Sequence, residues 1–147
     1  MGKSLIEIAK AVLQTEAESV LALQERIDDN FEKICNTLKG CRGKVVLIGM
    51  GKSGHVAKKI SSTMASTGTP SFFLHPGEAG HGDLGMVTRD DVVIMISYSG
   101  EADEIVALLP GIKRMNTPII SLTGNVKSSI ANSSDFHLDV SVDKEAC

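Results

Sequence analysis

The sequence has few of the residues that proteins use to bind nucleic acid or lipid. Tryptophan is absent and only 3% of the 147 residues are aromatic, so surfaces that stack on bases are not expected. Acidic residues outnumber basic residues by 18 to 15, and the formal net charge is −3. This balance predicts no basic surface for nucleic acid or an anionic membrane. No apolar run approaches membrane-spanning length, and the segment beginning at Met1 lacks a signal-peptide core.

Cysteine is also scarce. Cys35, Cys41 and Cys147 are an odd number without paired spacing, which indicates free thiols in a reducing compartment. Cys35 and Cys41 have no nearby partner ligands for zinc. A chain of this length can bury the core of one domain. We therefore expect a single cytoplasmic α/β domain with an added segment.

Short apolar runs rich in β-branched residues alternate with helical patterns from residue 45 onward. The runs predict strands at 45–48, 71–74, 92–96, 118–122 and 136–140. Helices are predicted at 53–67, 101–115 and 125–131, and a glycine-rich loop that can hold a short helical turn at 75–86. This alternation predicts a doubly wound, five-stranded parallel sheet of the flavodoxin-like kind.

Residues 1–40 are predicted to form a helical arm that precedes the α/β domain at 41–147. Ser4 and Glu7 fit a capping box, and apolar residues recur at helical spacing as far as Leu38. The arm could be one helix or two helices joined near residues 28–30. It could pack on the sheet or dock a second subunit, and we favour a role in dimer formation.

The loop after the first strand is the strongest candidate for an anion site. Glycines at 49, 51 and 54 follow a buried strand and open a helix, where backbone N–H groups favour phosphate. The same glycines satisfy the dinucleotide fingerprint, but His75, not an acidic residue, follows the second strand. A Walker A loop would need glycine at Val46. A phosphate loop of another kind is therefore favoured.

A second candidate loop, Ser97–Glu101, follows the third strand. In a flavodoxin-like sheet the first and third strands flank the switch point, so both loops are expected at one edge. Ser97 and Ser99 supply hydroxyl groups, and Gly100 permits close approach of the backbone. The alternative is that the serines only cap the following helix.

Six segments together resemble the SIS (sugar isomerase) domain family, and most closely the arabinose 5-phosphate isomerases of the Kdo and lipopolysaccharide pathway. The segments are Gly49–His55, Ala65–Phe73, His75–Glu78, His81–Val87, Ser97–Glu101 and Lys144–Cys147. The resemblance implies reversible conversion of D-arabinose 5-phosphate to D-ribulose 5-phosphate through an enediol. It also implies a tetramer with active sites between subunits, and a reaction that needs no redox cofactor.

The resemblance implies catalytic roles for Lys52, Glu104 and Glu145, with one of the two glutamates as the base. It implies substrate contacts at Gly51, Ser53, His81, Ser97, Ser99 and Gly100. His81 is also implied as a site for inhibitory zinc. From the residues alone, each catalytic candidate has an ordinary alternative: a solvated lysine, a carboxylate at a helix start and a solvated terminal charge.

The remaining histidines, and two positions that differ from the family's usual residues, complete the expectations from the sequence. His55 and His75 could rim the pocket, whereas His137, inside a strand, is predicted to be structural. Where the family commonly has asparagine, this chain has Tyr98, which could point away or narrow the pocket. Ala102 replaces a small hydroxyl residue, a lost donor worth about 0.5–1.5 kcal/mol.

Family members continue beyond the motif at 144–147. That further part includes a covering helix, a catalytic histidine and often a pair of CBS domains, which are not expected within 147 residues. The alternative to an isomerase is a catalytically silent module that senses sugar phosphate.

Overall fold

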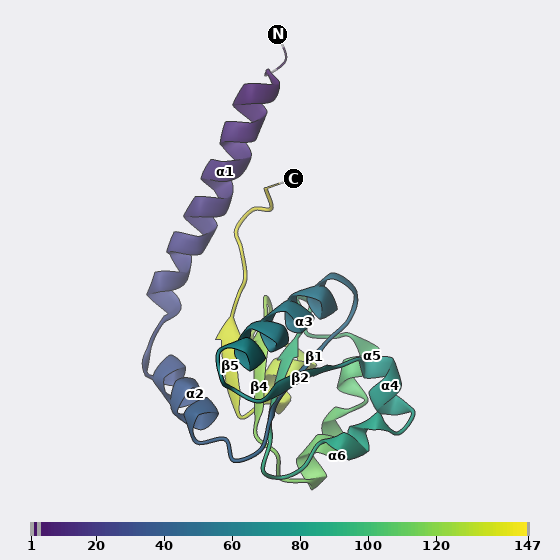
Figure 1. Ribbon diagram of the computed structural model, residues 1–147. Helices are drawn as coiled ribbons and strands as arrows, with labels where there is room; N and C mark the ends of the chain where they lie inside the picture. The colour runs from purple at the N-terminus through teal and green to yellow at the C-terminus, as the bar shows by residue number, and fades with distance from the viewer. Residues whose placement is uncertain (1, 3, 147) are drawn as a thin grey trace.

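The chain folds around one parallel sheet, and the computed structural model describes residues 2 and 4–146 (Figure 1). Its strands are β1 (Val45–Gly49), β2 (Ser71–Leu74), β3 (Val92–Ile96), β4 (Ile119–Thr123) and β5 (Phe136–Asp139). All neighbouring strands are parallel and their order is β2-β1-β3-β4-β5. The predicted flavodoxin-like order is confirmed, with the switch point between β1 and β3.

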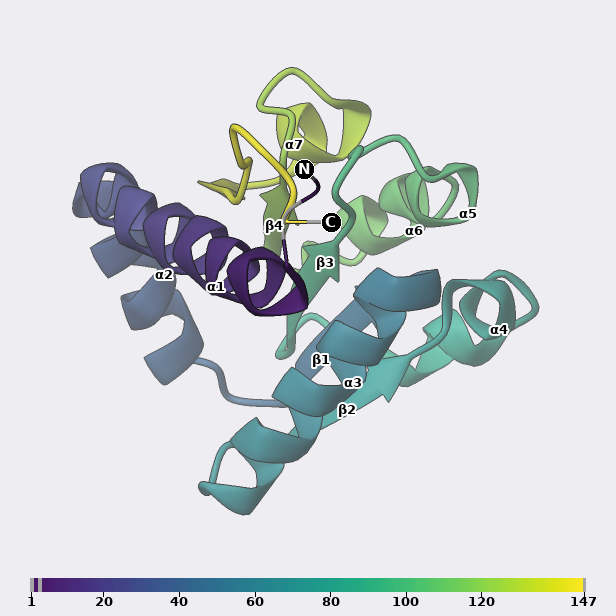
Figure 2. The same ribbon diagram turned by 90° about the horizontal axis from the view of Figure 1, so that it is seen from above.

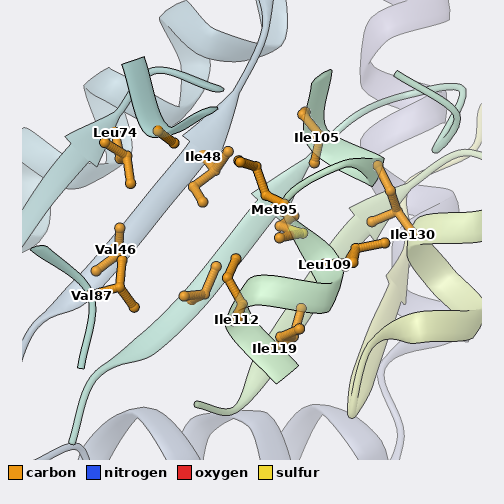
Figure 3. Packing of buried hydrophobic residues seen from close by; sticks show 13 residues of the cluster. Val46, Ile48, Leu74, Val87, Met95, Ile105, Leu109, Ile112, Ile119 and Ile130 are labelled. Carbon is orange, nitrogen blue, oxygen red and sulfur yellow. The ribbon is translucent and has the colours of Figure 1, made fainter. Parts of the chain in front are cut away.

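Helices cover both faces of the sheet because its inner strands are apolar on both sides. Along β1, Val45 and Leu47 face one layer, whereas Val46 and Ile48 face the other. The first layer packs on α2 (Asp29–Lys39) and α3 (Gly51–Ser66). The second contains residues of α4 (Pro76–Gly80), α5 (Asp103–Val106), α6 (Leu109–Arg114) and α7 (Ser129–Ser133) (Figures 2 and 3). A short 3-10 turn, η2 (Asp83–Met86), follows α4 within the glycine-rich segment.

The arm consists of two helices, not one. α1 (Leu5–Ala22) and the 3-10 turn η1 (Leu23–Arg26) precede a break at Ile27, whose backbone is extended. Asp28 then caps α2 by accepting the N–H of Asn30 at 2.9 Å. The predicted capping box of α1 is present.

The two helices of the arm differ in how they contact the rest of the chain. Ile34 of α2 is buried against the sheet. α1 has no buried residue and stands away from the body of the protein (Figure 1). The arm therefore packs its apolar residues on the sheet through α2, and Arg26 of η1 adds a polar contact with Asp139 of β5.

Two predicted helices are wrong in extent. The helix expected at 101–115 is divided between α5 and α6, because Pro110 has no N–H to donate to the carbonyl of Val106. The helix expected at 125–131 begins only at Ser129, where the Ser128 hydroxyl accepts the N–H of Ala131. Within the described residues, no helix is both long and apolar enough to span a membrane.

Candidate functional site

The loop between β1 and α3 is shaped by close contact of strand and helix. A Cβ on Gly54 would lie 2.7 Å from the carbonyl oxygen of Gly49, so this approach requires glycine. Gly51 has a φ of +56° and starts α3. Met50, at the N-cap, makes no side-chain capping bond, and within the described residues no other side chain accepts the first N–H groups of this 16-residue helix. The turn therefore offers backbone donors to an anion.

The loop after β3 is stabilised by its own serines. The Ser97 hydroxyl accepts the N–H of Gly100 at 3.2 Å, and the Ser99 hydroxyl accepts the N–H of Glu101 at 3.2 Å. Ala102 is the N-cap of α5 and makes no side-chain capping bond, so neither serine caps this helix. Each hydroxyl still has its hydrogen to donate, and Ser99 is exposed.

Gly100 and Glu101 connect this loop to the start of α7 through hydrogen bonds. Gly100 has a φ of +69°, and a Cβ there would overlap the Ser128 hydroxyl. Its carbonyl accepts the N–H of Ile130 at 3.1 Å. The Glu101 carboxylate accepts the N–H of Ser129 at 2.7 Å, a bond that lowers the pKa of Glu101. The loop is thus bound to the start of α7 by two hydrogen bonds.

The sheet register brings the two loops together. Gly49 pairs with Ile96, so β1 and β3 end at the same level. Lys52 and Ser53 lie in the first turn of α3, directly after β1, and Ser97 and Ser99 lie directly after β3. The phosphate-binding candidates therefore gather at one edge, as expected from the switch point.

The remaining candidates lie in three further segments, which follow β2, β3 and β5 in the chain. Glu104 is exposed in α5, His81 is exposed at the end of α4, and Glu145 is exposed in the segment after β5. Among the described residues, no hydrogen bond or ion pair joins any two of Lys52, Glu104 and Glu145. Their side chains are free to contact a ligand.

A depression of about 270 Å³ lies beside the glycine loop. Its lining includes Gly51, His55, Lys58 and His75, so both predicted rim histidines border one cavity. His75 also caps α4, because its Nδ1 accepts the N–H of Gly77 at 3.1 Å. Sequence analysis missed Lys58, although its position three residues after His55 places both on one face of α3.

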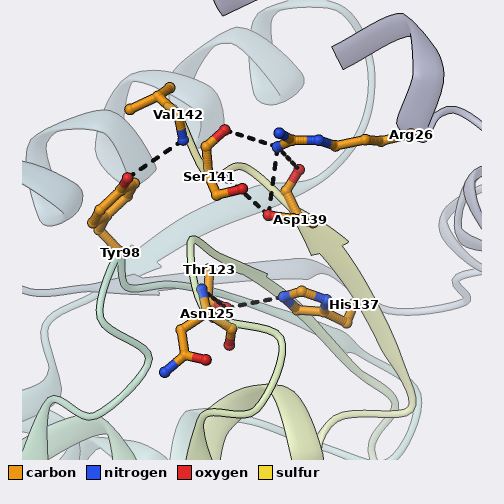
Figure 4. A network of polar contacts seen from close by, with 8 residues as sticks. All are labelled: Arg26, Tyr98, Thr123, Asn125, His137, Asp139, Ser141 and Val142. Atoms are coloured by element: carbon orange, nitrogen blue, oxygen red, sulfur yellow. Dashed lines mark hydrogen bonds and ion pairs between the residues drawn. The ribbon is translucent and has the colours of Figure 1, made fainter. Parts of the chain in front are cut away.

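His137 has a structural role in β5. Its Nε2 lies 2.9 Å from the Thr123 hydroxyl, which donates its only hydrogen to the Asn125 carbonyl (Figure 4). The imidazole must therefore donate from Nε2. Burial lowers the pKa of His137, against the opposing effects of Asp139 and Thr123.

Tyr98 points away from the glycine loop. Its carbonyl accepts the N–H of Gly124 at 2.8 Å, and its ring packs so closely that a Cβ on Gly124 would lie 2.7 Å from Cε2. Its hydroxyl accepts the N–H of Val142 at 3.4 Å (Figure 4). This contact with the C-terminal segment could not be read from the sequence.

The described part of the chain contains no group of three or more His, Cys, Asp or Glu residues placed to hold a metal ion. Within that part of the chain, His81 therefore does not belong to a set of three or more such ligands that could hold a zinc ion. The donors assembled at this edge are hydroxyl groups, backbone N–H groups and lysines, which are suited to a phosphorylated ligand.

The fold and the paired loops define an α/β domain whose phosphate-binding candidates follow the two strands at the switch point. The model of the SIS domain family matches residues 38–147, so the chain belongs to that family.

Relatives extend over nearly the whole chain. It is 55% identical to arabinose 5-phosphate isomerase KdsD of Escherichia coli K12 over 146 residues, covering 99% of this chain and 44% of the relative. The KdsD of Pseudomonas aeruginosa PAO1 is 54% identical over 142 residues, covering 97% and 44%. The chain thus spans less than half the length of these relatives.

A solved structure has the same fold. The c3406 protein of E. coli CFT073, in complex with arabinose 5-phosphate, superposes with a TM-score of 0.88 at 47% identity. The match covers 100% of this chain and 79% of that protein.

Proposed function

We propose that this chain is the isomerase domain of an enzyme that interconverts D-arabinose 5-phosphate and D-ribulose 5-phosphate, as part of Kdo and lipopolysaccharide synthesis. The observation that carries the proposal is the 55% identity to KdsD over 99% of the chain. The two donor-rich loops at adjacent strand ends support it, because they match the chemistry of a phosphate monoester. We take residues 41–147 as the domain and 1–40 as its arm.

In this proposal the phosphate binds between the two loops. Ser97 and Ser99 donate hydroxyl hydrogens, since their oxygens already accept loop N–H groups. Gly51 and Ser53 add N–H groups at the start of α3. Gly100 keeps the second loop free of a side chain.

The chemistry requires proton transfer between C1 and C2 of the open-chain sugar. A glutamate, Glu104 or Glu145, takes the proton from C2 while the aldehyde oxygen gains one, giving the enediol. The hydroxyl on C2 then loses its proton as C1 gains one, which gives the ketose. Lys52 stabilises the oxygen on which negative charge develops, and His81 contacts the sugar.

We propose a homo-oligomer, with a tetramer as its form, located in the cytoplasm and acting without nucleic acid. The apolar surface of α1 supports association: Leu5, Ile6 and Leu13 are 85%, 70% and 65% exposed. The net charge of −3 supports the exclusion of nucleic acid.

The test measures binding and turnover separately. Calorimetry with arabinose 5-phosphate reports binding, and a coupled assay reports ribulose 5-phosphate. Lys52→Met, Glu104→Gln and Glu145→Gln should each lower kcat by about 10²–10⁴-fold. Glu32→Gln, an exposed carboxylate on α2, is the matched control and should leave kcat unchanged.

The outcomes distinguish the two candidate functions. Turnover that is lost in these variants supports the isomerase. Binding without turnover in the unchanged chain would support a catalytically silent sugar-phosphate sensor instead. Absence of binding would overturn both.

A further inference from the structure

The segment that follows β5 is held from two sides. Val140 N–H donates to the Thr123 carbonyl at 2.9 Å, which extends the pairing of β4 and β5 by one bond. Ser141 N–H donates to the Asp139 carboxylate at 2.9 Å and turns the chain. From there to residue 146 the segment runs beside α1 (Figure 1).

Arg26 anchors this segment from the arm. Its Nη1 lies 2.7 Å from the Ser141 carbonyl oxygen and 3.3 Å from that of Asp139. The same nitrogen lies 3.5 Å from the Asp139 carboxylate (Figure 4). The side chains of Arg26 and Asp139 are 29% and 32% exposed, so the contacts are partly shielded from solvent. All three contacts come from Nη1, and the ammonium group of a lysine lies one bond short of that position, so lysine cannot place a donor there.

Tyr98 anchors the segment from the opposite side. Its hydroxyl accepts the N–H of Val142, and its ring is fixed on Gly124. Tyr98 lies between the two serines proposed to bind phosphate. The contact therefore connects the phosphate loop directly to the C-terminal segment.

The anchors limit where Glu145 can lie. Glu145 is three residues beyond Val142, so its Cα can lie no further than about 10 Å from that of Val142. Catalysis is sensitive to the placement of a reacting group, and displacement by about 1 Å can cost 10²-fold in rate.

We propose that Arg26 and Tyr98 are positioning residues that hold the segment carrying Glu145 in a fixed place relative to the phosphate loop. This inference rests on the proposed function for its catalytic consequence, but the anchoring can be measured without turnover. It makes the junction between α1 and α2 part of the active-site framework.

The first test is amide hydrogen exchange of the peptide that covers residues 140–146. In Arg26→Lys and in Tyr98→Phe, this peptide should exchange about 2- to 10-fold faster than in the unchanged chain. Arg89→Lys, in the turn that precedes β3, is the control and should not change the exchange rate of this peptide. Unchanged exchange in both anchor variants would overturn the proposal, whether or not the chain is an isomerase.

The second test separates positioning from general stability. Arg26→Lys should lower kcat about 10-fold and leave KM within twofold, because the phosphate loops are untouched. In a Glu145→Gln background the same substitution should have no further effect on the residual kcat. A rise in KM alone, or full additivity, would overturn the positioning role. Absence of turnover in the unchanged chain would instead count against the proposed function.

Discussion

Substitution of Gly100 by alanine tests whether the loop after β3 has a left-handed backbone at this position and packs closely on α7. A φ of +69° costs an alanine about 1–2 kcal/mol. The new Cβ would also overlap the Ser128 hydroxyl, and such overpacking costs about 1–3 kcal/mol. We expect a total loss of about 2–5 kcal/mol, which is within the stability of a domain of this size.

The assay is urea unfolding followed by circular dichroism, since the chain has no tryptophan and one tyrosine for fluorescence. Gly80→Ala is the matched control, because nothing lies within 4 Å of its Cβ position. It should be neutral or stabilise by up to about 1 kcal/mol.

A double variant separates the two costs. Ser128→Gly removes the overlapping group, and glycine at a helix N-cap costs only a few tenths of a kcal/mol. Combined with Gly100→Ala, it should restore about 1–3 kcal/mol and leave the backbone cost. A loss below about 1 kcal/mol in Gly100→Ala, or no restoration in the pair, would refute this account of the loop.

Three further predictions concern other parts of the chain. Ala102→Ser should cap α5, stabilise the fold by about 0.5–1 kcal/mol and tighten arabinose 5-phosphate binding in calorimetry. Because burial lowers the pKa of His137, the free energy of unfolding should fall as pH drops below about 6.5, until the lower folded-state pKa is passed. His137→Gln should remove that part of the slope in urea titrations between pH 5 and about 8. Leu13→Glu on the exposed face of α1 should reduce the mass measured by light scattering without unfolding the chain.

The sheet could be predicted from the sequence because its signals are local. Each strand is a short β-branched run, and each connection is helical, so parallel order follows from chain topology. The switch point and its two loops then follow from the order of the strands. The break before α6 was also visible in principle, because Pro110 lies inside the predicted helix.

Contacts between distant segments could not be predicted in this way. Arg26 and Ser141 are separated by 115 residues, and no local pattern links them. The two roles of His75, which caps α4 and borders the cavity, depend on how β2 ends. Tyr98 differs from the asparagine that the family commonly has at this position. Its ring packs on Gly124, where the absence of a side chain leaves room for it.

The most direct test of the proposed chemistry is proton NMR of arabinose 5-phosphate incubated with this chain in D₂O. Proton transfer through an enediol predicts ribulose 5-phosphate that carries deuterium at C1, and recovered arabinose 5-phosphate that gains deuterium at C2 over repeated turnovers. Glu145→Gln should slow both changes together. Product free of deuterium, or neither product nor exchange, would contradict the enediol mechanism at this site.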